Sequence, residues 1–173
     1  MRMVMRMVML FVLGSLAVAP AHAQSRGDPL RPLTKCTLEL SIVSGRDVGQ
    51  IGTDRLRAIV DGRLRSLGIR VITDEDVAKD TASIPAFEVR ATTIALTSRS
   101  GERIGTAFYL DTSLIEWTTI SRTHALVPAV LWTEGHLQAT GVEDLPDVLA
   151  RDIDAQLDKF ATALHKANPA QKP

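Results

Sequence analysis

Covalent cross-links within the chain are excluded, because its 173 residues include a single cysteine, Cys36. Small exported domains often depend on disulfides, and here the stability must come from packing instead. Cys36 can serve as a small apolar residue at the start of a strand, or it can form an intermolecular disulfide. We favour the first interpretation.

An excess of charge of either sign is also lacking, because the chain has 20 Lys and Arg against 20 Asp and Glu. Two of the arginines lie in an N-terminal leader without acids, so the remainder has 18 basic and 20 acidic side chains. Nothing in that balance favours a nucleic acid as a partner. No second run of about 18 apolar residues follows the leader, so we expect no transmembrane segment after its cleavage.

Motifs for catalysis or cofactor binding are missing as well. The histidines beyond the leader, His124, His136 and His165, form no zinc-binding pattern. The glycine-containing loop over 44–52 lacks the Gly-Lys-Ser/Thr of a phosphate loop. The acidic run over 73–76 lacks the alternating ligands of a calcium site and resembles a helix capping box instead. We therefore predict no catalytic residue, no metal and no cofactor.

The N-terminal leader is the clearest positive signal. Arg2 and Arg6 precede an apolar run over 7–19, and Ala21-His22-Ala23 is a small-x-small cleavage site. We predict a signal peptide over 1–23, and hence a periplasmic or secreted protein. The apolar run of about 13 residues is shorter than the roughly 20 that span a bilayer, which disfavours a retained anchor.

Composition divides the rest of the chain into a linker, a domain and a tail. The segment 24–35 is polar with two prolines, which predicts a flexible linker. Lys35 stands where a lipobox has a small residue, which disfavours lipidation at Cys36. We expect a single globular domain over 36–167 and a disordered tail over 168–173.

Alternation of apolar and polar residues predicts most of the strands. Strands are expected around Leu38–Ile42 and over 69–72, 86–96, 104–120 and 126–137. The alternation is lost after Leu114, which indicates a bulge or bend. Pro128 cannot donate to a strand ladder, so its end of the last strand is expected at an edge or a bulge.

Two stretches have the apolar spacing of amphipathic helices, 53–67 and 144–166. Thr53 is expected to cap the first helix and Gly68 to end it. The arginines of this helix can form either a patch for an anionic partner or a solvated face on which Asp61 pairs with Arg65. We favour the solvated face.

The order of elements predicts an α+β fold. We expect a two-layer sandwich in which a mostly antiparallel four- to five-stranded sheet carries two amphipathic helices on one face, in the order β-α-β-β-β-β-α. The other face is then left partly uncovered and apolar. Exposed apolar area of that kind often marks a contact surface.

The candidate interaction face follows from this arrangement. Tyr109, Ile115 and Trp117 are expected on the uncovered face. In the last strand, Trp132, Glu134 and His136 alternate onto one face. They can form a sugar-binding or acid–base cluster, or an exposed sheet face with a tryptophan at its rim, and we favour the latter.

The resulting functional hypothesis is an exported, non-catalytic envelope protein. It would act as an adaptor, assembly factor or accessory subunit through contacts with an unidentified protein, or with further copies of itself. A soluble periplasmic carrier or sensor, which binds a small ligand on the tryptophan-bearing face, is the alternative. An enzyme is the third and least favoured class.

Overall fold

The structure, a computed structural model, describes residues 30, 33–45, 51–77, 84–141 and 144–169. The predicted signal peptide lies outside the described residues. The elements follow in chain order: β1 (Lys35–Ser44), α1 (Thr53–Ser66), β2 (Arg70–Val71), α2 (Asp74–Val77), β3 (Ala86–Thr97), β4 (Arg103–Thr119), β5 (Leu126–Thr140) and α3 (Leu145–Ala167).

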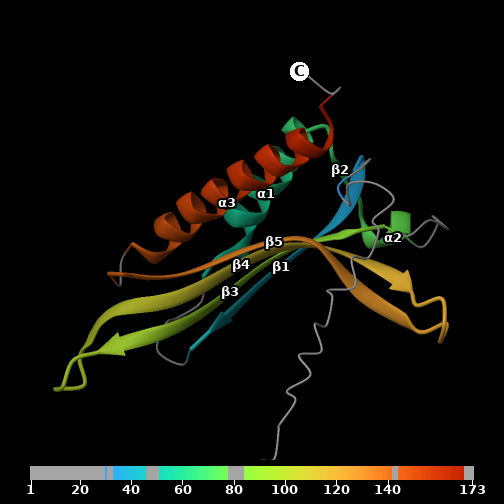
Figure 1. Cartoon of the computed structure of the whole chain (residues 1–173). Helices are drawn as coiled ribbons and strands as arrows, with labels where there is room; N and C mark the ends of the chain where they lie inside the picture. Colours follow the sequence, from blue (N-terminus) through green and yellow to red (C-terminus); the bar gives the residue numbers. More distant parts are fainter. Residues whose placement is uncertain (1–29, 31–32, 46–50, 78–83, 142–143, 170–173) are drawn as a thin grey trace, which may run out of the picture.

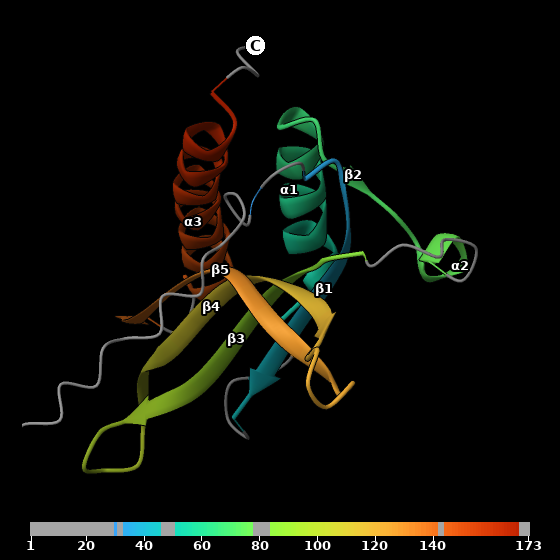
Figure 2. The ribbon, with the colours of Figure 1, turned by 45° about the vertical axis from the view of Figure 1, so that its right-hand side comes forward.

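The strands form one open five-stranded sheet in the spatial order β2-β1-β3-β4-β5. Helices α1 and α3 lie side by side over one face of it (Figures 1 and 2). The predicted two-layer α+β sandwich is therefore confirmed. The sheet is mixed rather than mostly antiparallel, because β1 runs parallel to both β2 and β3. The chain returns to the sheet from β1 through α1, and such a crossover makes neighbouring strands parallel.

The core lies between the sheet and the two helices. Phe87 on β3, Phe108 on β4 and Phe160 on α3 are each at most 1% exposed. The rings of Phe87 and Phe160 meet edge to face, with their centroids 5.0 Å apart. Alternate residues of β1, β3 and β4 are buried against the helices, as the sequence alternation predicts. This packing replaces the cross-link that a single cysteine cannot provide.

The end of α1 is set by Gly68, whose φ is +77°. The amide of Gly68 donates to the Arg65 carbonyl, and the amide of Ile69 donates to the Leu64 carbonyl, each over 3.0 Å. These two bonds form a Schellman motif, which favours glycine at the left-handed position. The predicted helix stop is therefore confirmed. The predicted cap by Thr53 is wrong, because Gly52 occupies the N-cap and no side chain bonds there.

The four arginines of α1 each contact an oxygen of a neighbouring group. Arg55 pairs with Asp147 at 2.7 Å and Arg63 pairs with Asp158, so both join α1 to α3. Arg65 pairs with Asp61 at 2.9 Å, as predicted. The guanidinium of Arg57 donates to the Leu38 carbonyl over 3.2 Å. These contacts favour a solvated face over an anion-binding patch, and exposed pairs of this kind add little stability.

Strands β4 and β5 continue past the end of β3. Ile115 is the last residue of β4 with a β3 partner, and a register shift between Leu114 and Ile115 leaves Leu131 opposite no β4 residue. The predicted bulge is thus confirmed. Beyond it, residues 115–130 form a two-stranded ribbon closed by a turn, termed the arm, which projects to the right of the sheet in Figure 1. Pro128 lies in this ribbon on β5, which is an edge strand as predicted.

The two ends of the described domain meet beside the core. Leu30, which the sequence assigns to the linker, is 5% exposed. Its carbonyl accepts a hydrogen bond of 3.3 Å from the Asn168 side chain, which also donates to the Leu164 carbonyl. Most of 24–32 and all of 170–173 lie outside the described residues, so the linker and tail boundaries stay predictions.

Candidate functional site

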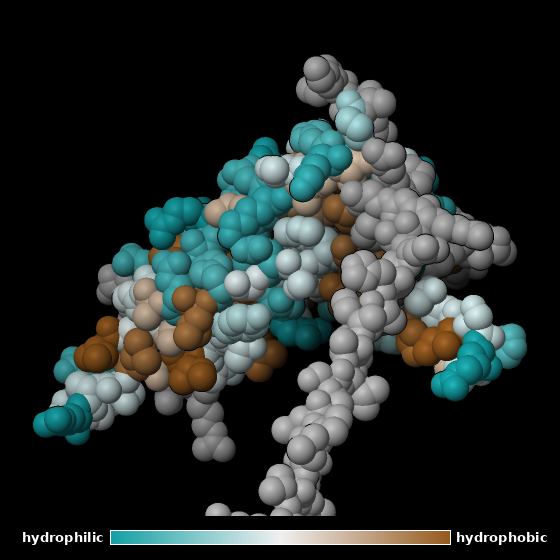
Figure 3. Space-filling model, viewed as in Figure 1, coloured by the Kyte–Doolittle hydropathy of each residue, from teal (hydrophilic) through white to brown (hydrophobic). Residues whose placement is uncertain are grey.

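The face of the sheet opposite the helices carries exposed apolar side chains near the hairpin that joins β3 to β4. The strand register places Val43, Thr92, Tyr109 and Leu137 in one row across four strands. The apolar residues of this row are exposed: Val43 is 54%, Tyr109 49% and Leu137 74% exposed. Ile94, in the next row on the same face, is 64% exposed. We term these four apolar residues the open-face patch. Figure 3 shows apolar surface gathered at this end of the molecule.

Tyr109 is held in the patch by the absence of a side chain on β5. A Cβ atom placed on Gly135 would lie 2.5 Å from the Tyr109 hydroxyl oxygen. The ring therefore lies across Gly135, where any larger residue would displace it. Tyr109 is 49% exposed, so much of its ring surface is available to a partner.

The centre of the same face is polar. Arg90 pairs with Glu88 at 3.2 Å along β3. The hydroxyl of Thr133 donates to the Asp111 carboxylate over 3.3 Å. These groups separate the open-face patch from the arm, where Ile115 and the 52% exposed Trp117 lie. The uncovered face thus holds two apolar zones with a polar band between them.

Trp132, Glu134 and His136 do share one face of β5, but it is the face that the helices cover. Each lies opposite a buried β4 residue, namely Leu114, Thr112 and Leu110. The Trp132 ring stacks on Phe87 with centroids 6.5 Å apart and meets Phe160 edge to face at 5.1 Å. The interpretation as an exposed face with a rim tryptophan is therefore wrong. The bulge at Leu131 and the position of α3 determine which face of β5 is covered. Neither can be located from the alternation of apolar and polar residues alone.

His136 belongs to a polar network that joins the sheet to α3. One ring nitrogen, Nε2, lies 3.2 Å from the Asp152 carboxylate, and Nδ1 lies 3.2 Å from the Gln156 amide nitrogen. Gln156 also donates to the Leu110 carbonyl and accepts from the Thr112 hydroxyl. The amide nitrogen of Gln156 can only donate, so Nδ1 accepts and the proton of a neutral imidazole sits on Nε2.

This network has a structural role. Both ring nitrogens of His136 are engaged, and Glu134 forms an ion pair with Lys159 of α3 rather than with the histidine. An acid–base pair would need a histidine nitrogen that can reach a substrate. The arrangement instead satisfies Gln156 and Thr112, which are at most 1% exposed.

Cys36 is fully buried at the start of β1, as expected for a small apolar residue. Burial, and next the negative charge of Asp61, raise the pKa of its thiol to about 12. The thiolate is the reactive form, so Cys36 is poorly suited to act as a nucleophile. Its burial also disfavours an intermolecular disulfide.

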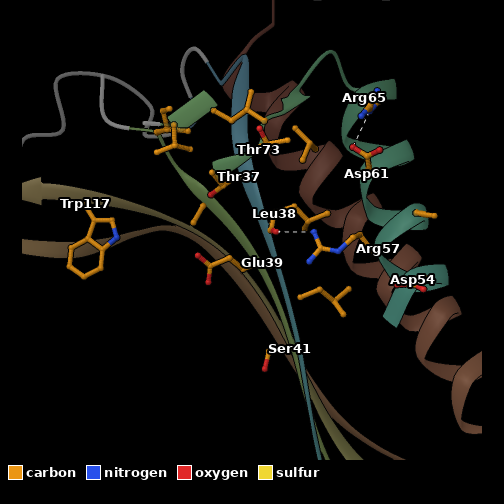
Figure 4. A pocket seen from close by; sticks show the side chains of 17 residues that line it. Thr37, Leu38, Glu39, Ser41, Asp54, Arg57, Asp61, Arg65, Thr73 and Trp117 are labelled. Carbon is orange, nitrogen blue, oxygen red and sulfur yellow. Dashed lines mark hydrogen bonds and ion pairs between the residues drawn. The ribbon is translucent and has the colours of Figure 1, made fainter. Parts of the chain in front are cut away.

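A groove of about 1080 Å³ runs along the outer edge of β1. Figure 4 shows Arg57 and Asp61 of α1 on one side, Trp117 of the arm on the other, and Thr37 and Glu39 of β1 between them. Within the described residues, β1 pairs with β2 only at Lys35 and Cys36, so the edge beyond them borders the groove. Its lining is mixed apolar and charged.

Within the described residues, no group of three or more His, Cys, Asp and Glu side chains is placed to hold a metal ion. The helices that the structure describes include none with the length and apolar character needed to cross a membrane.

Sequence reasoning did not identify Val43, Ile94 and Leu137 as members of the exposed surface. Leu137 alternates with His136 along β5, so assigning one to a face assigns the other to the opposite face. That signal was present, but apolar residues are ordinarily placed toward the core. The groove gave no sequence signal, because it depends on how far β2 extends beside β1.

Comparison with known proteins shows only distant likeness. No protein-family model and no curated protein matches the chain. Among solved structures, the chain is similar to rare lipoprotein B from Shewanella oneidensis, with 11% identity, 75% of this chain and 94% of that chain covered, and a TM-score of 0.37. It is also similar to the PelC dodecamer from Paraburkholderia phytofirmans, with 14% identity, 77% and 87% covered, and a TM-score of 0.39.

A third similar structure is a minor lipoprotein from Acinetobacter baumannii, with 14% identity, 75% and 90% covered, and a TM-score of 0.32. At these identities and TM-scores, the likeness carries no functional argument.

Proposed function

We propose that this chain is an exported, non-catalytic envelope protein that acts as an adaptor, assembly factor or accessory subunit, and that a protein partner docks on its open-face patch. The observation that carries the proposal is the exposure of Val43, Ile94, Tyr109 and Leu137 on the uncovered face. Contiguous exposed apolar surface is uncommon on monomers and often marks an interaction site. Export rests on the predicted leader over 1–23.

The chemistry of the described residues supports a binding role over catalysis. Both ring nitrogens of His136 are engaged, and the Cys36 thiol is buried with a raised pKa. Tyrosine is favoured at the centre of protein interfaces because its rigid ring buries much area at little entropic cost. The polar band beside the patch, with Arg90 and Glu88, would form part of the polar rim.

A quantitative capture experiment from envelope extract tests this proposal. Leu137→Asn changes the most exposed residue of the patch, and Ala155→Asn introduces the same residue on the exposed side of α3 as a matched control. We expect a protein that the wild type retains to be lost with Leu137→Asn and kept with Ala155→Asn. Equal recovery by all three baits would rule out the patch as the docking site.

The groove beside β1 favours a second candidate function, that of a carrier or sensor for a small ligand. Its volume of about 1080 Å³ is comparable to ligand pockets, which span roughly 300–1,000 Å³. The tryptophan that lines it is Trp117, whereas Trp132 packs, partly buried, against Phe87 and Phe160 on the other face of the sheet. Titration with candidate ligands should then change the fluorescence of the wild type but not of Trp117→Phe. An unchanged wild-type spectrum counts against a carrier.

A further inference from the structure

The arm, residues 115–130, has one apolar side. Cross-strand pairing places three pairs on that side: Ile115–Val130, Trp117–Pro128 and Thr119–Leu126. Val130 and Leu126 are 59% and 62% exposed, and Ile120 at the turn is 42% exposed. The opposite side has Thr118 paired with Val127, and Glu116 paired with Ala129. The arm is therefore a two-stranded ribbon with one mainly apolar side and one side of mixed polarity, and it continues beyond the end of β3.

Charge is distributed unusually along the arm. The arm has one acid, Glu116, at its base, and the 14 residues beyond it, 117–130, contain one arginine, Arg122, one histidine, His124, and no acid. The whole chain has 23% charged residues and as many acids as bases. The remaining polar residues of the segment are threonines and a serine. Moving their hydroxyls from bulk water to an interface where they can still form hydrogen bonds costs little free energy. Figure 3 shows the apolar surface of the arm beside a hydrophilic tip.

We propose that the arm inserts its apolar side into the interface of an anionic phospholipid bilayer. Leu126 and Val130 would enter the acyl boundary, while Arg122 at the turn pairs with anionic head groups. Trp117 suits the same boundary, because tryptophan is favoured at the level of membrane head groups. The charge complementarity lies in the outer part of the arm, where Arg122 is unopposed by an acid, whereas Glu116 lies at the base on the other side of the ribbon.

This inference does not depend on the open-face patch. The patch lies at the end of the sheet near the β3–β4 hairpin, and the arm lies beyond the opposite end of β3. A protein partner on the patch and a bilayer at the arm could therefore be present together. Substitutions in one zone leave the other unchanged, so the two proposals can fail separately.

Tryptophan fluorescence of the exported chain, purified as the cell processes it, tests the proposal. The protein is mixed with vesicles of phosphatidylcholine alone, or of phosphatidylcholine with phosphatidylglycerol. The chain has two tryptophans, and Trp132 is partly buried against Phe87 and Phe160 on the helix-covered face. A blue shift that appears on adding vesicles and is absent in Trp117→Phe therefore reports Trp117. The leader contains no tryptophan and cannot produce the shift by itself.

The variants are neutral, so that added charge does not confound the comparison. Leu126→Gln removes an apolar residue from the inserting side, and Thr118→Gln is its matched control on the other side of the ribbon. We expect Leu126→Gln to weaken binding to the mixed vesicles by about tenfold, as loss of one buried leucine side chain implies. Thr118→Gln should bind as the wild type does, and Trp117→Phe should bind without a blue shift.

Arg122→Gln tests the anionic preference. It should weaken binding to the mixed vesicles by roughly fivefold and leave binding to phosphatidylcholine unchanged. The proposal is overturned if the wild type shows no vesicle-dependent blue shift, or if Leu126→Gln binds as tightly as Thr118→Gln. A blue shift that grows with protein concentration without vesicles, together with a doubled mass in light scattering, would assign the arm to self-association instead.

Discussion

Gln156 is the residue on which the contact between α3 and the sheet most depends. Its side chain bonds at once to the Thr112 hydroxyl, the Leu110 carbonyl and the His136 ring. Gln156 and Thr112 are at most 1% exposed, so their polar groups lie where water has little access. A buried polar group of this kind is stable only while its whole set of hydrogen bonds is intact.

Substitution of Gln156 by alanine should therefore be costly. Removing the amide leaves three polar groups without their partner and opens a cavity, and we expect a loss of roughly 2–4 kcal/mol in the free energy of unfolding. Urea denaturation measures this directly. Asp154→Ala, an exposed neighbour on the same helix, serves as control and should change stability by less than about 0.5 kcal/mol. Similar midpoints for the two variants would contradict the assigned role.

The thiol of Cys36 makes stability depend on alkaline pH. Its pKa rises from 9.0 to about 12 on folding, so the folded state holds the proton more tightly than the unfolded state. The stabilisation is complete below pH 9.0 and is lost as the pH rises toward about 12. We expect the stability of Cys36→Ala to fall less steeply across that window than that of the wild type. Parallel pH profiles in urea denaturation would show that the thiol does not titrate as described.

At the scale of the element, replacement by alanine should change the stability of the fold in opposite directions at two glycines, one inside α1 and one directly after it. Gly68 has a φ of +77° and closes the Schellman motif, so Gly68→Ala should destabilise the fold by about 1 kcal/mol. Gly62 lies exposed inside α1, and a Cβ there meets no atom within 4 Å. Gly62→Ala should stabilise by about 0.8–1 kcal/mol. Thermal unfolding of both variants checks the prediction, which fails if the two shifts have the same sign.

The elements also show how far the sequence determines the fold. Helix α3 and the strands β3 and β4 could be predicted, because their periodic apolar residues are buried on one side over many residues. The cap of α1 could not, since Gly52 and Thr53 are both acceptable capping residues and the backbone geometry decides between them. The bulge after Leu114 was indicated by lost alternation, but its position on β5 at Leu131 was not.

Strand β5 explains most of the difference between the expected and observed candidate site. Its covered face carries Trp132, Glu134 and His136, whereas its uncovered face carries Val130 and Leu137. Usual patterning would place the polar residues outside, but α3 offers Lys159, Asp152 and Gln156 as partners to them. Alternation shows which residues share a face, and only packing shows which face is covered.

For the whole molecule, the packing of a helix layer on one face of the sheet determines which surface is available for binding. Two helices cover one face of the sheet, and the other face, within the described residues, is covered by no helix (Figures 1 and 2). That asymmetry leaves the open-face patch exposed. The two-layer architecture could be predicted from element order, while the exposure of Leu137 required the register. The proposed function rests on this uncovered face.

Site-specific photo-crosslinking in the cell that produces the protein is the most direct test of whether a protein docks on the open-face patch. A photoreactive residue is placed at Leu137 in the patch, and at Ala155 on the exposed side of α3 as the matched control. We predict a discrete protein adduct at position 137 and none at position 155. The absence of an adduct at 137, or the same adduct at both positions, would contradict the proposal that a protein docks on the open-face patch.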